Sequence, residues 1–361
     1  MRIVLKLGSS LLDSRSGVNQ EFINNFANQI SSLSNHTFTI ITSGAISTGM
    51  RKLNYSEKPK DVATLQALAA IGQSDLIKAY EDAFDQKKII AQVLLTNPDF
   101  SDRMRYLNIR NTLNTLISKN VIPVVNENDT VTVMDIKKAA FGDNDTLSAH
   151  VAAATESDLL IILTNTEGLY DKNPKEKGAK LIRKIDRVTD KEIQMCSGTS
   201  KLGRGGMLSK VTAAKIATEA GIKVIVCSGD IPNVIQKAIA EEVGTVFSPI
   251  KSSRFNQKKH WIMFASESKG KIFVNENAMQ CTISKDCGIS PIDTVAVEGD
   301  FKKGDVIEIA SEDGEVLCKG ITNYYSSEIE KIKGKNIEDI YKVLGFAYED
   351  VVSSSDMVLT E

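Results

Sequence analysis

The sequence predicts an α/β protein with a mainly parallel sheet sandwiched by helices, followed by a small, mostly β domain. First, short apolar runs alternate with helical patterns through most of the chain, which is typical of βαβ units and a sheet covered on both faces. Second, residues 251–260 (KSSRFNQKKH) are polar and basic, as in a linker. Third, short strands separated by turn signals follow that linker.

The elements of each part follow from apolar runs that end at Gly, Ser, Asn or Asp. In the first part we expect strands at 3–7, 38–42, 89–95, 121–125, 159–163 and 224–227. The helices between them should cover 20–33, 61–86, 104–119, 145–155 and 208–220. In the second part we expect strands at 271–274, 294–297, 306–310 and 316–319. The expected domains are 1–255 and 269–361, joined by a linker at 256–268.

Composition excludes several classes of protein. A chain of 361 residues is long enough for two domains at roughly 100–200 residues each. Its apolar runs are far shorter than the ~18 residues of a membrane helix, and Lys6 interrupts the N-terminal run, so we expect no membrane segment and no signal peptide. Three scattered histidines argue against a structural zinc site. The chain has five cysteines: Cys196, Cys227, Cys281, Cys287 and Cys318. They form no CxxC pair, which favours reduced thiols and a cytoplasmic protein.

Charge is divided unevenly along the chain. Residues 266–361 carry 10 lysines, no arginine and 19 acidic residues, a formal charge of −9, which leaves +7 on residues 1–265. The first part therefore suits small anionic ligands. The acidic second part argues against nucleic-acid binding, because phosphate contacts need clustered cations.

Polar residues gather where the expected strands end, and ligands of parallel sheets bind at that edge. The first strand has Lys6 near its end and is followed by Gly8 and Ser9. Lys6 is either an edge lysine that reaches solvent or an ammonium aimed at a phosphate, with Gly8 allowing backbone N–H groups to approach. The turn at residues 43–45 (SGA) is either a simple tight turn or an anion-binding turn that opens a helix.

Two further polar segments point to a polar ligand. Residues 126–129 (NEND) hold more polar groups than a turn requires. Residues 142–145 (GDND) precede a helix, so Asp145 either caps that helix or orients lysines. The spacing alone does not decide between these two roles.

The segment 202–210 (LGRGGMLSK) places three glycines before a helix and a lysine on its first turn. Such loops bind phosphates, and we favour that interpretation over a flexible loop with a solvated lysine. The chain contains no G-x-x-x-x-G-K-[ST], and no G-x-G-x-x-G follows the first strand. A P-loop and a dinucleotide dehydrogenase are therefore disfavoured.

The ordered set KLGSS, TSGAIS, NEND, GDND, GLY and GGM-x-x-K resembles the amino acid kinase family, and most narrowly its glutamate 5-kinases. The tail resembles the PUA domain that many of these kinases carry. The resemblance implies transfer of a phosphoryl group from ATP, with Mg²⁺, to the γ-carboxylate of L-glutamate, the first step of proline biosynthesis. It also implies a homo-oligomer (dimer or tetramer), proline as feedback inhibitor, and hand-off of the product to glutamyl phosphate reductase.

The resemblance also implies roles for individual residues. The catalytic residues would be Lys6, Asp145 and Lys210. The glutamate-binding residues would be Ser43, Gly44, Ala45, Asp129, Asp143 and Asn144. The ATP-binding residues would be Lys6, Gly8, Ser9, Thr164, Asn165, Arg204, Gly205, Gly206, Met207, Leu208, Ser209 and Lys210.

Three alternatives remain at this stage. One is another amino acid kinase, such as an acetylglutamate or aspartate kinase, although these lack the NEND and GDND pair followed by a PUA-like tail. A second is an RNA-binding protein that acts through the PUA-like domain, against which the −9 charge argues. A third is a sensor that binds glutamate or proline without turnover, against which the two lysines argue.

Overall fold

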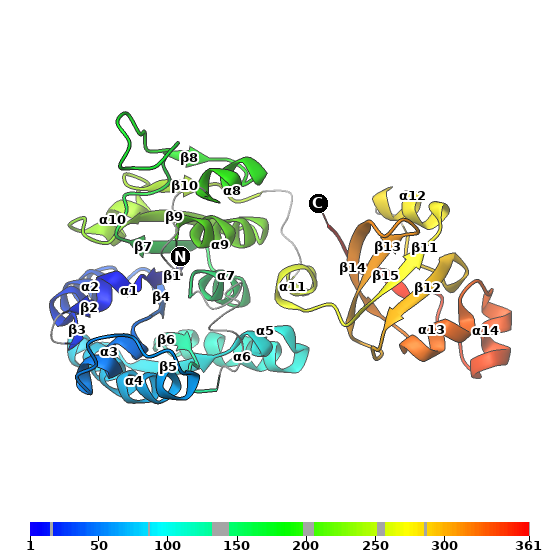
Figure 1. Cartoon of the computed structure of the whole chain (residues 1–361), viewed down its shortest axis with the longest axis horizontal. Helices are drawn as coiled ribbons and strands as arrows, with labels where there is room; N and C mark the ends of the chain where they lie inside the picture. Colours follow the sequence, from blue (N-terminus) through cyan, green and yellow to red (C-terminus); the bar gives the residue numbers. More distant parts are fainter. Residues whose placement is uncertain are drawn as a thin grey trace. The chain divides into compact units, whose positions relative to one another are not determined.

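The computed structural model of the chain describes residues 1–14, 17–85, 87–131, 144–197, 206–250, 257–284 and 287–360. The chain forms two compact units (Figure 1). The first contains Met1–Asp99 and Met104–Arg254, and the second contains Phe100–Arg103 and Phe255–Glu361. Within the second unit, Trp261 Nε1 donates to the carbonyl of Phe100 at 2.8 Å. The expected domain boundaries at 255 and 269 stay a prediction.

An eight-stranded sheet organises the first unit, in the order β5-β6-β4-β1-β7-β9-β10-β8. Neighbouring strands are parallel except β9 and β10, so the expected mainly parallel sheet is confirmed. The strands are β1 (Arg2–Leu7), β4 (Thr37–Ile41), β5 (Ile90–Leu95), β6 (Ile122–Glu127), β7 (Leu159–Thr164), β8 (Lys184–Ile185), β9 (Lys223–Ser228) and β10 (Thr245–Phe247). The short strands β8 and β10 are additional to the sequence-based expectation.

Helices cover both faces of this sheet, with α2 and α10 on one side and α7 and α9 on the other (Figure 1). The long helices coincide with those expected: α2 (Gln20–Ser32), α4 (Val62–Phe84), α6 (Arg103–Ser118), α7 (Asn144–Ala154) and α9 (Met207–Glu219). The helix that the turn at residues 43–45 was expected to precede is α3 (Ala45–Lys52). Shorter elements that the sequence pattern did not indicate are α1 (Ser9–Leu12), β2 (Asp13–Ser14), β3 (Gly17–Val18), α5 (Asn97–Ser101), α8 (Asp190–Ser197) and α10 (Val234–Ile239). Their length leaves little room for a periodic pattern.

Two glycines allow α3 and α4 to pack closely. A Cβ atom at Gly72 would lie 1.9 Å from the carbonyl oxygen of Ala45, and one at Gly49 would lie 1.9 Å from the carbonyl oxygen of Leu68. Both distances are far below van der Waals contact, so the backbones meet only because these side chains are absent. This contact sets the middle of α4 against the beginning of α3.

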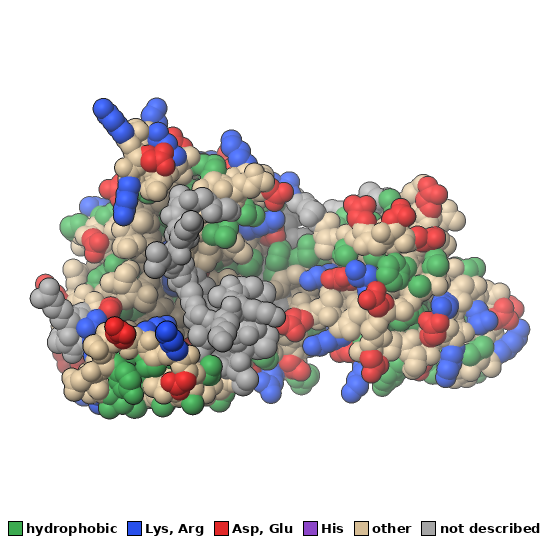
Figure 2. Space-filling model, viewed as in Figure 1, with side chains coloured by type: hydrophobic (Ala, Val, Ile, Leu, Met, Phe, Trp, Pro, Cys, Tyr) green, Lys and Arg blue, Asp and Glu red, His purple; other side chains and the backbone are tan. Residues whose placement is uncertain are grey.

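The second unit has a five-stranded sheet in the order β12-β11-β13-β14-β15. Its strands are β11 (Gly270–Val274), β12 (Thr294–Gly299), β13 (Val306–Ser311), β14 (Val316–Thr322) and β15 (Val352–Leu359), and all but β15 were expected. Its helices include α11 (Gln257–His260), α12 (Glu276–Ser284), α13 (Ser326–Ile332) and α14 (Ile337–Leu344). On the face in Figure 2, acidic and basic side chains are interspersed across its described residues.

Two chain-wide expectations concern membranes and thiols. None of the described helices is both long enough and apolar enough to span a bilayer. The structure joins Cys281 and Cys287 in a disulfide, with their Cα atoms 5.9 Å apart. The expectation of five reduced thiols is therefore wrong for this pair, because the spacing of the two cysteines in the sequence did not show that the fold brings their sulfurs together. The other three cysteines, Cys196, Cys227 and Cys318, are buried thiols.

Candidate active site

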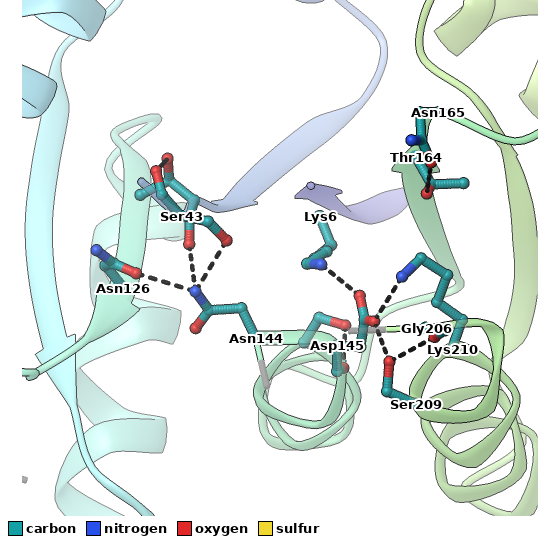
Figure 3. A network of polar contacts seen from close by, with 12 residues as sticks. Lys6, Ser43, Asn126, Asn144, Asp145, Thr164, Asn165, Gly206, Ser209 and Lys210 are labelled. Carbon is teal, nitrogen blue, oxygen red and sulfur yellow. Dashed lines mark hydrogen bonds and ion pairs between the residues drawn. The ribbon is translucent and has the colours of Figure 1, made fainter. Parts of the chain in front are cut away.

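The polar residues predicted from the sequence meet at the carboxyl ends of β1, β4, β6 and β7, beside the first turns of α7 and α9 (Figure 3). Parallel neighbours end at the same edge of the sheet, which brings residues far apart in the sequence to one place. Figure 3 shows two groups of contacts there, one around Asp145 and one around Asn144.

Lys6 is a buried cation in the middle of the sheet. Its strand lies between β4 and β7, where Lys6 is level with Ile41 and Ile162, and the residue is only 4% exposed. Its Nζ lies 2.5 Å from Asp145 Oδ1. An edge lysine that reaches solvent is therefore excluded, and the ammonium is held at the carboxyl end of the strand.

Asp145 links this lysine to a second one. Its side chain is fully buried, and its Oδ2 accepts from Lys210 Nζ at 3.0 Å and from Ser209 Oγ at 2.7 Å. Burial alone would raise the pKa of this carboxyl, but Lys6 and Lys210 outweigh it and hold the pKa below its ordinary value. Two ammonium groups then share one carboxylate, which leaves one net positive charge. Such a group can bind an anion and neutralise the charge that develops on it.

Asn144 is the centre of the second group. Its Nδ2 lies 2.9 Å from the carbonyl oxygen of Thr42, 2.9 Å from Ser43 Oγ and 3.2 Å from Asn126 Oδ1. Asn126 Nδ2 in turn donates to Gln73 Oε1 at 2.9 Å. Asn144 Oδ1 is buried and lacks a hydrogen-bond partner among the described residues. This group therefore offers an acceptor to a polar ligand.

The turn after β4 borders the same group. Gly44 has φ of +95°, a left-handed conformation that favours glycine, and it precedes Ala45, the first residue of α3. Ser43 and Ala45 are both buried. The left-handed residue turns the chain from strand to helix within one residue, so that Ser43 Oγ faces Asn144.

Asp129 follows β6 by two residues and is partly buried. Burial raises the pKa of its carboxyl to about 6, and the nearby charge of Lys58 only partly opposes this effect. A buried carboxylate gains more from a nearby positive charge than an exposed one does. It is therefore suited to an ammonium group brought by a ligand.

The residues predicted to bind nucleotide lie on the other side of Lys6. Gly8 N donates to the carbonyl of Leu163 at 3.0 Å, and a Cβ atom at Gly8 would come within 3.2 Å of that oxygen. Thr164 ends β7 and is buried, whereas Asn165 and Ser9 are exposed. Gly8 thereby brings the ends of β1 and β7 into close contact.

The first turn of α9 completes this side. Gly206 precedes the helix in an extended conformation and provides no side-chain cap, and the first backbone N–H groups of a helix are suited to an anion. Ser209 and Lys210 turn toward Asp145, whereas Leu208 is 40% exposed. Three predicted site residues lie outside the described residues: Asp143, Arg204 and Gly205.

Sequence reasoning missed two members of the Asn144 group. Asn126 belongs to the NEND segment, but only Asp129 of that segment was chosen as a ligand-binding residue. Gln73 lies in the middle of α4, where its polarity is the only local signal, and a glutamine on a helix is ordinarily solvated. Its burial was the missing observation. Across the described ranges, no three His, Cys, Asp or Glu residues gather into a group that could hold a metal ion.

Comparison with known proteins identifies the family to which the chain belongs. The amino acid kinase family profile matches residues 1–228, and the PUA domain profile matches residues 270–344. The glutamate 5-kinase of Caldanaerobacter subterraneus subsp. tengcongensis is 44% identical over 100% of this chain and 98% of its own. The glutamate 5-kinase of Dictyoglomus thermophilum is 43% identical over 99% of this chain and 97% of its own. Among solved structures, the UMP kinase of Bacillus anthracis is similar over 69% of this chain and 96% of its own, with 16% identity and a TM-score of 0.49.

The two profiles follow one another along the chain, and the glutamate 5-kinases match it from end to end. An identity above 40% over nearly the full length of both chains leaves little room for a different branch of the family. The chain is thus a member of the amino acid kinase family, within its glutamate 5-kinase branch.

Proposed function

We infer that the chain transfers the γ-phosphoryl group of ATP to the γ-carboxylate of L-glutamate and forms L-glutamyl 5-phosphate, the first step of proline biosynthesis. The observation that carries this inference is the buried Lys6–Asp145–Lys210 group beside the Asn144 group, in a chain that matches glutamate 5-kinases along its whole length. The first group supports phosphoryl transfer and the second supports recognition of an amino acid. The same full-length match disfavours another amino acid kinase, an RNA-binding protein and a sensor without turnover.

The chemistry needs little from the protein beyond position and charge. The γ-carboxylate of glutamate is already ionised at pH 7, so no general base is required. Its oxygen attacks the γ-phosphorus in line while negative charge spreads over the phosphoryl oxygens. In our proposal Lys6 and Lys210 neutralise that charge, and Asp145 holds their ammonium groups in place before the substrates arrive.

We assign the amino acid to the Asn144 side of the site. The α-ammonium of glutamate would face Asn144 Oδ1, which has no hydrogen-bond partner among the described residues, and the Asp129 carboxylate, whose pKa burial raises. Ser43, Gly44 and Ala45 would line the turn around the substrate, with Asp143 beside them. Acetylation of the amino group would remove the positive charge that these residues select.

We assign the nucleotide to the side of α9. The glycine-rich segment with Gly206 and the first turn of α9 would bind the phosphates through backbone N–H groups. ATP enters as its Mg²⁺ complex, so the metal ion is part of the substrate in this proposal. The remaining proposed nucleotide contacts are Gly8, Ser9, Thr164, Asn165, Arg204, Gly205, Met207, Leu208 and Ser209.

The wider context is also part of the proposal. We expect a cytoplasmic homo-oligomer, a dimer or tetramer, with proline as feedback inhibitor at the glutamate site. The product is a reactive acyl phosphate, which favours direct hand-off to glutamyl phosphate reductase. Nucleic acid is not an expected partner, because residues 266–361 carry a formal charge of −9.

Trapping of the acyl phosphate tests the proposed activity. With Mg·ATP and hydroxylamine, the protein should form hydroxamate from L-glutamate, and little from L-aspartate or N-acetylglutamate. The amount of ADP released in the same reactions should equal the amount of hydroxamate formed if each phosphoryl transfer yields the acyl phosphate. Comparable rates with N-acetylglutamate would contradict the assignment of substrate.

A further inference from the structure

Three side-chain amides form a chain of hydrogen bonds behind the proposed glutamate site. Asn144 Nδ2 contacts Asn126 Oδ1 at 3.2 Å, and Asn126 Nδ2 contacts Gln73 Oε1 at 2.9 Å. Gln73 and Asn126 are 7% and 1% exposed, so neither amide can turn to solvent. We call Gln73, Asn126 and Asn144 the amide chain.

A backbone carbonyl sets the direction of the amide chain. The carbonyl oxygen of Thr42 can only accept a hydrogen bond, so Asn144 must present its NH₂ group there. The same NH₂ group faces Asn126, which must then present its oxygen. Asn126 therefore turns its own NH₂ group toward Gln73, whose oxygen accepts it. Every amide orientation thus follows from Thr42.

This direction leaves one unused group at each end. Asn144 Oδ1 is a buried acceptor and Gln73 Nε2 is a buried donor, and neither has a partner among the described residues. A buried donor without a partner is destabilising, so a fold optimised for stability alone would not place a glutamine here. The buried amide of Gln73, in the middle of α4, thus points to a role in the site rather than in the core.

We propose that Gln73 is a positioning residue for substrate recognition, which acts through Asn126 to hold Asn144 Oδ1 toward the α-ammonium of the amino acid. The proposal rests on the proposed glutamate kinase activity. Gln73 accepts the hydrogen bond that keeps Asn126 oriented, and Asn126 accepts one that keeps the Asn144 oxygen facing the ligand. Gly72 helps to place Gln73. The close contact of α4 with Ala45 at Gly72 brings the next residue, Gln73, to the turn at residues 43–45.

The test replaces Gln73 in the full chain by methionine, which has a similar volume but cannot accept this hydrogen bond. Gln73→Met should raise KM for L-glutamate about tenfold, because hydrogen bonds to charged groups are worth more than neutral ones. KM for Mg·ATP and kcat at saturating glutamate should stay within about twofold. Gln73→Glu keeps an acceptor for Asn126 and should restore most of the affinity. Gln66→Met, two turns earlier on α4, is the matched control.

Two measurements separate this role from a merely structural one. Glutarate lacks the ammonium group, so Gln73→Met should lower the ratio of kcat/KM for glutamate over glutarate. In an Asn126→Ala background, Gln73→Met should add no further loss, because its effect passes through Asn126. Additive losses, or an unchanged ratio, would overturn the proposal. If wild-type protein formed no hydroxamate from glutamate, the proposed function would fail instead, and that result is seen before any variant is compared.

Discussion

Asn144 and Asp145 are consecutive residues of α7 whose side chains reach opposite parts of the site. Asn144 Nδ2 lies 2.9 Å from Ser43 Oγ, whereas Asp145 Oδ2 lies 3.0 Å from Lys210 Nζ (Figure 3). Successive residues of a helix point about 100° apart, so one helical start can serve two ligands. In the proposed reaction, α7 thereby sets the amino acid and the transferred phosphoryl group at a defined separation.

The two lysines should be needed for turnover more than for folding. Lys6→Ala and Lys210→Ala should each lower kcat by about 10²–10³, the usual effect of removing a preorganised charge from a transition state. Lys6→Arg should not restore activity, since a planar guanidinium does not fit the place of an ammonium. Steady-state kinetics and circular dichroism measure the two effects. The control is Lys78→Ala, which breaks an exposed ion pair with Asp82. A near-normal kcat in Lys6→Ala or Lys210→Ala would show that this lysine does not stabilise the transition state.

Asp145→Asn should lower both turnover and thermal stability. The Asp145 carboxylate contacts Lys6, Lys210 and Ser209, so loss of its charge removes a counter-ion that two buried ammonium groups share. Loss of one partner of a buried ion pair typically costs about 3–5 kcal/mol. A lower melting temperature with reduced kcat is the expected result, measured by calorimetry and kinetics. A residue that only capped α7 would tolerate asparagine in both measurements.

The lowered pKa of Asp145 has a second consequence. Because its folded-state pKa lies below the ordinary value, its contribution to stability is present at neutral pH and is lost as pH falls through that folded value. The wild-type and Asp145→Asn proteins should therefore differ most in melting temperature near pH 7 and least in strong acid. A difference that grew as pH fell would contradict the assigned direction of the pKa shift.

Asp129 should make glutamate binding depend on pH near 6. Burial raises its pKa to about 6, so below that pH the carboxyl is neutral and cannot pair with the substrate ammonium. KM for glutamate should rise as pH falls from 7 to 5. Binding of glutamate at pH 6 should release protons, because the substrate ammonium lowers the pKa of the Asp129 carboxyl. Asp129→Asn should show a high KM at all of these pH values. Titration calorimetry in buffers of different ionisation enthalpy measures the proton release, and a pH-independent wild-type KM would exclude Asp129 from this role.

A chain truncated after residue 254 should keep phosphoryl transfer. The described residues of both site groups belong to the first unit. The loss should instead destabilise the segment near Phe100, whose carbonyl accepts from Trp261 Nε1. Hydroxamate formation and the melting temperature of the truncated protein measure the two effects. A folded truncated protein without activity would show that the second unit completes the site.

Much of the architecture was readable from local patterns. Buried strands such as Leu159–Thr164 are continuous apolar runs, and helices such as Met207–Glu219 follow a glycine-rich segment, so both could be located without a structure. Strand ends also identified Lys6, Asp145 and Lys210 as candidates, because ligands of parallel sheets bind at that edge. Short elements escaped prediction, since β8 has two residues and its pairing depends on β10.

The sequence alone could not choose between the two roles of Lys6 or of Asp145, because each choice depends on what lies across the sheet. Residues 6, 145 and 210 come from β1, α7 and α9, and only the order β4-β1-β7-β9 and its covering helices bring their charges together. The same holds for Gln73, whose burial depends on the fit of α4 against α3 at Gly72. Hydrophobic periodicity is a local property of the chain, whereas burial, counter-ions and amide orientation belong to neighbours that only tertiary packing supplies.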